Sequence, residues 1–200
     1  MNSEEAVSPV IGVMLMLVVT IIIAAVVSAF AGGLSSGTEK APQASIEVSL
    51  MCGIDDGMGG STDKMLFKHL SGDPIPTKDL AIITYYTNKS GHIYKHEQTA
   101  SSPGTDPYGS GSLVRVPFLN DMRLGYSSEG NSDFGNVTWT TGDVLDTGTI
   151  AGTADLLGIN DDSSPHKIAD PEFGPGSVVE VKILHTPSGK YIYNKEVVAV

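Results

Sequence analysis

The chain divides into two regions with different hydrophobic patterns. No charged residue lies between Glu5 and Glu39, and the stretch Val10–Ala31 is interrupted only by one glycine, one threonine and one serine. A helix of about 22 residues rises about 33 Å, which matches the roughly 30 Å hydrocarbon thickness of a bilayer. Because apolar residues surround this helix instead of forming one stripe, the pattern predicts a membrane-spanning helix and not an amphipathic surface helix.

The flanks of this apolar stretch indicate where the helix starts and stops. Ser8 and Pro9 form a helix start, since a serine hydroxyl can cap free amides and proline at the first helical position loses no needed hydrogen bond. The segment 31–37, AGGLSSG, supplies three glycines and two serines. Such a composition is typical of a helix stop followed by a flexible connection, so we expect a Gly/Ser-rich linker at 32–44.

From residue 45 onward the pattern changes to short alternating runs separated by Gly, Pro, Asn, Asp and Ser, which is typical of antiparallel β structure. No helix of ordinary length is expected there. The predicted strands are Ser45–Leu50, Lys64–His69, Leu80–Thr87, a weaker Ser112–Leu119 that Pro117 marks as an edge or strand end, Val178–His185 and Lys190–Val200. The last two flank a four-residue Thr-Pro-Ser-Gly turn and should form a hairpin.

Taken together, these patterns predict an α+β protein. A long hydrophobic N-terminal α-helix should be followed by an antiparallel β-sandwich, Ig-like or similar, at 45–200. A small barrel is the nearest alternative. The roughly 160 residues outside the apolar segment are enough for one domain with its own core.

Charge and cysteine content argue against two classes of protein, namely nucleic-acid-binding proteins and disulfide-stabilised domains. The chain has 23 acidic and 12 basic residues, and its formal net charge is -11. Nucleic acid is not expected as a partner, because neutralising phosphates requires clustered lysine and arginine. Cys52 is the single cysteine, so an intrachain disulfide is impossible and stability must come from burial.

A secretory signal peptide is the main alternative for the N-terminal segment. Signal peptides normally have a basic n-region and an apolar core of about 7 to 15 residues. Here the preceding residues MNSEEA are acidic and the apolar run is longer. Both features argue against a signal peptide.

Three segments resemble archaeal type IV pilins. The segment 5–16, EAVSPVIGVMLM, closely resembles the N-terminal signature of that family, and FKHLSGDPI at 67–75 and ILHTPSGK at 183–190 are similar to segments that recur in its globular domains. The resemblance covers the N-terminal helix and the two ends of the globular domain. The middle of the chain, 90–173, carries no family motif.

The resemblance implies proteolytic processing. A prepilin-type membrane peptidase would remove a leader at 1–6 by cutting after Ala6, with Glu5 as the charged neighbour and Val7 as the mature N-terminus. The hydrophobic helix would then be 7–31. This sequence departs from the commoner basic leader, because it carries Glu4 and Glu5.

The resemblance also implies the partners. Subunits inserted in the membrane before assembly would leave it with the help of pilus assembly machinery and pack their helices into a helical homopolymer. An apolar helix suits both lipid and neighbouring helices, and small residues permit close helix approach; they are Gly12, Ala24, Ala25, Ser28 and Ala29. Bacterial type IV pilins usually carry an early glutamate in this helix, which 7–11 lacks.

Few residues of the domain invite a chemical role. His69 and His185 each precede a turn, and capping of that turn is preferred over metal binding or catalysis. His92 and His96 are four apart without a helix to bring them together, so a zinc site is discounted. The oxygen-rich loops 55–63 and 160–162 lack EF-hand spacing, and solvation is preferred over calcium binding.

Motifs for catalysis and nucleotide binding are also lacking. The segment 109–112, GSGS, does not have the spacing of a nucleophile elbow, and the sequence contains neither a phosphate-binding loop nor a dinucleotide fingerprint. We therefore expect no enzyme activity, no catalytic residue, no metal and no cofactor.

Two tripeptides are acceptor sequons for N-glycosylation, beginning at Asn88 and Asn136. They are candidate modification sites if the domain is exported. The preferred function is a structural filament subunit whose β-domain provides surface contact or adhesion. A membrane-anchored β-domain that binds a ligand or partner without polymerising is the alternative, and an anchored hydrolase is a third possibility.

Overall fold

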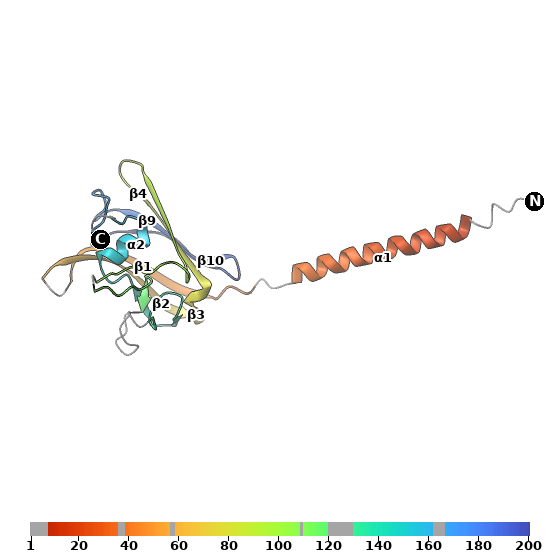
Figure 1. The fold of residues 1–200 in the computed structure, drawn as a ribbon, viewed down its shortest axis with the longest axis horizontal. Coiled ribbons are helices and arrows are strands. Elements are labelled where there is room, and N and C mark those ends of the chain that lie inside the picture. The colour runs from red at the N-terminus through yellow and green to blue at the C-terminus, as the bar shows by residue number, and fades with distance from the viewer. Residues whose placement is uncertain (1–7, 36–38, 57–58, 109, 120–129, 162–166) are drawn as a thin grey trace, which may run out of the picture. The chain divides into compact units, whose positions relative to one another are not determined.

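The computed structural model describes residues 8–35, 39–56, 59–108, 110–119, 130–161 and 167–200. The chain consists of two compact units, Met1–Glu39 and Lys40–Val200. Figure 1 shows an α-helix in the first unit and a β-rich domain in the second.

The first unit contains the helix α1 (Ser8–Ser35). This helix ends at Ser35, beyond the predicted end at residue 31. It includes the two glycines at 32 and 33, which the sequence places in the linker. A glycine costs about 1 kcal/mol relative to alanine in a helix but does not prevent it, and an existing helix gains one hydrogen bond for each residue it adds. Of the remaining linker, residues 36–38 lie outside the described part of the chain.

The second unit is built from antiparallel strands. The strands are β1 (Ala44–Asp55), β2 (Ser61–Gly72), β3 (Ile75–Pro76), β4 (Leu80–Thr87), β5 (Ile93–Gln98), β6 (Phe118–Leu119), β7 (Thr138–Trp139), β8 (Val144–Asp146), β9 (Val178–His185) and β10 (Lys190–Val198). One four-stranded sheet has the order β1-β2-β8-β6 and the other β10-β9-β4-β5, while β3 and β7 form a small third sheet. Every pairing between these strands is antiparallel.

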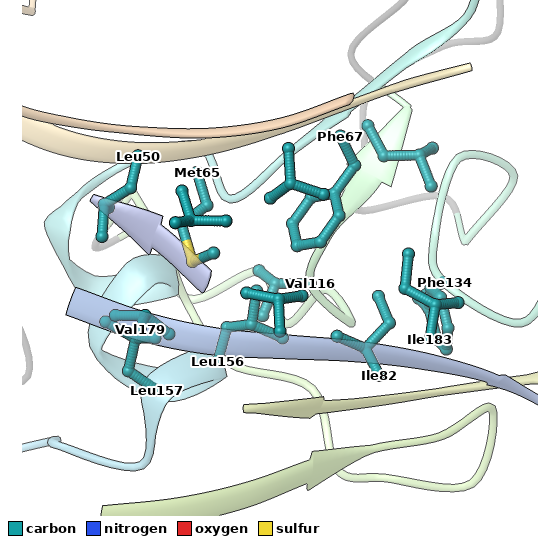
Figure 2. Close-up of a cluster of buried hydrophobic side chains, with 14 of the residues drawn as sticks. Leu50, Met65, Phe67, Ile82, Val116, Phe134, Leu156, Leu157, Val179 and Ile183 are labelled. Atoms are coloured by element: carbon teal, nitrogen blue, oxygen red, sulfur yellow. The ribbon is translucent and has the colours of Figure 1, made fainter. Parts of the chain in front are cut away.

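Both four-stranded sheets contribute to one hydrophobic core. Leu50 and Phe67 come from β1 and β2, and Ile82 and Ile183 come from β4 and β9 (Figure 2). The alternation in β9 is regular: every second side chain is buried and points to this core. The predicted combination of a hydrophobic helix and antiparallel β structure is therefore confirmed.

The predicted strands differ in accuracy. Those at 80–87 and 178–185 match β4 and β9, and the C-terminal hairpin forms as expected. The strand predicted at Ser112–Leu119 was largely wrong, because only Phe118–Leu119 pairs in a sheet as β6. Pro117 has no N–H to donate to a strand ladder, and the preceding residues follow a glycine-rich stretch.

A short buried helix, α2 (Ile150–Leu157), was not predicted. Its C-terminus is capped by Gly158 in the left-handed conformation. At its N-terminus the amide of Ile150 donates to the hydroxyl of Thr62 at 2.8 Å. Six of its eight residues are buried, and Thr84 of β4 donates to the carbonyl of Leu156 at 2.7 Å. The helix is thus part of the core.

Candidate functional site: the apolar helix and the domain surface

The apolar side chains of α1 have no partner within the described chain. The segment Val10–Phe30 is long and apolar enough to cross a membrane, and none of it is buried. Every large apolar side chain in this segment is at least 46% exposed, the lowest value being that of Val19. Soluble monomers rarely expose a continuous apolar patch larger than a few hundred Å². This helix therefore requires lipid or other helices around it.

The polar and small residues of α1 are compatible with both environments. Thr20 donates its hydroxyl to the carbonyl of Leu17 at 2.9 Å, so this group is satisfied within the helix, as a lipid environment demands. Ala24 and Ser28 are four residues apart, as are Ala25 and Ala29. Small residues at this spacing lie on one helix face and let a second helix approach closely.

The described part of the chain does not include the predicted processing site. Glu5, Ala6 and Val7 are outside the described residues. The helix itself begins at Ser8, with Pro9 in its first turn. The cleavage and the capping role of Ser8 therefore stay predictions.

The two sequons differ in how many hydrogen bonds their side chains already make. The side-chain amide of Asn88 donates to Asp170 Oδ2 at 3.0 Å, and its oxygen accepts from the backbone amide of His92 at 2.8 Å. The hydroxyl of Ser90 donates to Glu172 Oε1 at 2.8 Å. The sequon at Asn88 is thus held at both its first and third residues.

Asn136 is more accessible. Its side chain is exposed, as is that of Thr138, the third residue of the sequon. One hydrogen bond engages its amide nitrogen, which donates to the carbonyl of Gly130 at 2.6 Å. Sequence reasoning missed this difference, because Asp170 and Glu172 lie about 80 residues from the sequon that they hold.

Residues 5–46 match the family model described as Archaeal Type IV pilin, N-terminal. The N-terminal segment is similar to this family. The resemblance inferred from the sequence is therefore confirmed for this segment, and the pilin family is a structural, non-enzymatic one that assembles into filaments and associates with membranes.

A relative comes from Archaeoglobus fulgidus, where it is described as an uncharacterized protein. It is 38% identical to this chain over 81 residues, which is 40% of this chain and 52% of the relative. The chain thus spans about half the length of the relative that it matches. No solved structure matches this chain.

The two candidate histidines of the domain, His69 and His185, have different roles. His185 caps its turn as predicted, with Nδ1 2.8 Å from Ser188 Oγ. His69 does not. Its ring is buried against Trp139, with centroids 5.4 Å apart, and neither ring nitrogen has a hydrogen-bond partner among the described residues. The reason is its place in β2, where the alternation of the strand turns the ring into the domain interior.

In the acidic loop 55–63, aspartate side chains accept hydrogen bonds from backbone amides of neighbouring turns. Asp56 Oδ1 accepts from the amide of Gly60 at 2.9 Å, and Asp63 Oδ1 accepts from the amide of Gly53 at 2.8 Å. Residues 57–58 and 162–166 of these regions are not described. Within the described part of the chain, no three or more His, Cys, Asp or Glu side chains are grouped so that they could hold a metal.

Cys52 lies beside one of these carboxylates. Burial, together with the negative charge of Asp63 and a hydrogen bond to it, raises the pKa of the thiol to about 11. Because the thiolate is the reactive form, this cysteine is a poor nucleophile near neutral pH.

Proposed function

We propose that this protein is a structural subunit of an extracellular type IV pilus-like filament, polymerising through α1 with its β-domain on the filament surface. The observation that carries the proposal is the exposed, uncharged and all-round apolar helix, in a segment that matches the archaeal pilin N-terminal family. Transfer of this helix from lipid to a bundle of like helices leaves every face in an apolar environment. The small residues at Ala24, Ser28, Ala25 and Ala29 allow close packing there.

Processing precedes assembly in this proposal. A prepilin-type peptidase cleaves between Ala6 and Val7, so that leader 1–6 is lost, the helix 7–31 enters the filament, and the linker 32–44 joins it to the domain 45–200. Removal of the leader takes away Glu4 and Glu5. This matters physically, because a charged residue is costly to bring into a helix bundle or a bilayer core.

The β-domain provides the outer surface for adhesion or surface contact. N-glycosylation of the folded domain takes place at Asn136, which is exposed, whereas Asn88 is engaged with Asp170. Mass spectrometry of filament protein should find a glycan on the peptide with Asn136 and an unmodified peptide with Asn88. The reverse pattern contradicts this assignment.

A second candidate function is a membrane-anchored β-domain that does not polymerise. The same apolar helix is compatible with permanent residence in lipid. The two functions differ in where the protein is found and in its N-terminus.

One preparation distinguishes the two functions. Material sheared from the cell surface is examined by negative-stain imaging and by N-terminal sequencing. The pilus subunit should be recovered in filaments, with Val7 as its first residue. Recovery only as detergent-extracted monomers with Met1 intact contradicts the filament proposal and supports the anchored domain.

A further inference from the structure

The outer face of the sheet β10-β9-β4-β5 has a regular arrangement of residues. Opposite residues on neighbouring antiparallel strands lie on the same face and form rows across the sheet. From the registers, the four outer rows are Tyr191, Leu184 and Ala81; Asn194, Lys182, Ile83 and Glu97; Glu196, Glu180, Tyr85 and Lys95; and Val198, Val178, Thr87 and Ile93. We call this surface the outer face.

The outer face is apolar at both ends and charged in the middle. Val198, Val178 and Ile93 of the last row are 53%, 43% and 62% exposed, and Tyr191 of the first row is 53% exposed. The two exposed apolar ends are separated by the charged rows, and Ala81 and Ile83 of β4, only 1% and 8% exposed, contribute little to this surface.

On each of two strands, the two middle rows carry charges of opposite sign. On β9 Glu180 is two residues from Lys182, and on β5 Lys95 is two residues from Glu97. Lys182 already bonds Glu180 at 2.9 Å and lies over the ring of Tyr85. These contacts bring Glu180 and Lys182 together on the outer face.

This arrangement is self-complementary. A two-fold axis perpendicular to the strands, passing between the two middle rows, places each strand against the same strand of a second copy. Lys95 then meets Glu97 of the other copy, Glu180 meets its Lys182, and the apolar row containing Val178 meets the row containing Leu184. A two-fold axis parallel to the strands would instead place Lys182 against Ile83, which leaves a charge on an aliphatic side chain.

We propose that the outer face binds the outer face of a second copy of this chain and so joins neighbouring filaments side by side. The proposal rests on the proposed function. Subunits of one polar filament are related by a screw rotation and make head-to-tail contacts, whereas a two-fold contact is isologous. The second copy therefore belongs to another filament.

The size of the outer face fits this use. Four strands about 4.8 Å apart and seven residues at about 3.3 Å each give a footprint on the order of 400 Å². A standard stable interface buries roughly 800 Å² on each partner. One such contact is too small for a stable soluble dimer, but many copies along two filaments add their affinities.

Charge reversal of full-length filaments tests the proposal. The variants are Lys95→Glu, Glu97→Lys and the double variant with both changes, and the fraction of filaments in side-by-side bundles is counted in negative-stain images. Each single variant places like charges opposite each other, so bundles should fall roughly fivefold or more because the effect repeats along the filament. The double variant should restore them.

Mixing gives the sharpest result. Filaments of Lys95→Glu mixed with filaments of Glu97→Lys again place opposite charges together, so the mixture should bundle although neither variant does alone. Nonspecific repulsion predicts otherwise: Glu97→Lys makes the chain less negative and should then increase bundling. Lys68→Glu, on the other four-stranded sheet, makes the same change in net charge as Lys95→Glu and should leave bundling unchanged.

The outcomes separate this inference from the function on which it rests. Absence of wild-type filaments contradicts the proposed function. Wild-type filaments that never bundle, bundling of Glu97→Lys at the wild-type level, or failure of the mixture contradicts the outer-face contact alone. Loss of bundling by Lys68→Glu as well would show a general charge effect and also overturns it.

Discussion

The helix α1 and the β-domain differ in where their apolar side chains lie: exposed in the helix and buried in the domain. In the domain, polar and apolar residues alternate, and side chains such as Phe67 are fully buried inside the same chain. In α1 apolar residues occupy every face, and the chain itself buries none of them. The domain thus carries its own core, whereas the helix Val10–Phe30 finds no burial within the described chain.

A charge in the middle of α1 should have the largest effect. Val19→Asp places a carboxylate where lipid or other helices must surround it, at a cost of about 2.5 to 3.5 kcal/mol on permissive insertion scales. We expect loss of membrane insertion or of filaments, measured by membrane fractionation and negative-stain imaging. Val19→Leu is the matched control and should assemble normally. Normal filaments of Val19→Asp would contradict the burial of this helix.

Two phenylalanine truncations should separate the two regions. Phe67→Ala removes a fully buried ring from the domain core and should lower the free energy of unfolding by about 3 to 5 kcal/mol. Phe30→Ala removes a ring that is 68% exposed in α1 and should leave thermal unfolding of the domain unchanged. A similar loss of domain stability in both variants would show that the two regions fold as one unit.

The junction of α2 with the sheet should respond less strongly. Thr84→Val keeps the shape of the side chain but removes the buried hydroxyl that donates to Leu156. An unsatisfied buried carbonyl costs about 1 to 3 kcal/mol, which denaturant unfolding would detect. Thr87→Val changes an exposed threonine on the same strand and is the control. Equal stability of Thr84→Val and the wild type would mean that this hydrogen bond contributes nothing.

The smallest effect concerns the reactivity of the domain. The pKa of Cys52, raised to about 11, keeps the thiol protonated at pH 8, so alkylation by iodoacetamide should be slow and should accelerate as the pH rises toward 11. Asp63→Asn removes the negative charge that disfavours the thiolate, which lowers this pKa. The rate at pH 8 should then increase, and an unchanged rate would rule out the influence of Asp63.

The same contrast explains which parts could be predicted from the sequence. The helix and strands β4 and β9 have strong, uninterrupted patterns, because one environment surrounds all of α1 and a core lies along each of these strands. The hairpin of β9 and β10 follows from a Pro-Gly turn between two such runs. These elements needed no information from distant residues.

The middle of the chain could not be predicted, because its structure depends on distant contacts. The helix α2 is only eight residues long and contains Gly152 and Thr153, which have low intrinsic helix propensity. Gly152 is nevertheless required, since a Cβ there would lie 2.0 Å from the carbonyl oxygen of Thr147. Strand β5 presents polar His96 and Gln98 toward the interior, which hides its alternation from a hydrophobic pattern.

In the candidate site, too, only the features that depend on local sequence could be predicted. The apolar helix and the family of its segment follow from local sequence. The burial of His69 against Trp139 and the engagement of Asn88 by Asp170 do not, because each joins residues about 70 to 80 positions apart. Such contacts appear only in the folded domain.

The most direct test of the central claim is an image reconstruction of filaments sheared from the cell surface. The account predicts that residues 10–30 of neighbouring subunits pack against one another in the filament core, at interaxial distances of about 8 to 10 Å, with the β-domains outside. A filament whose core is formed by the β-domains, or in which this helix is absent or surrounded by solvent, would contradict it.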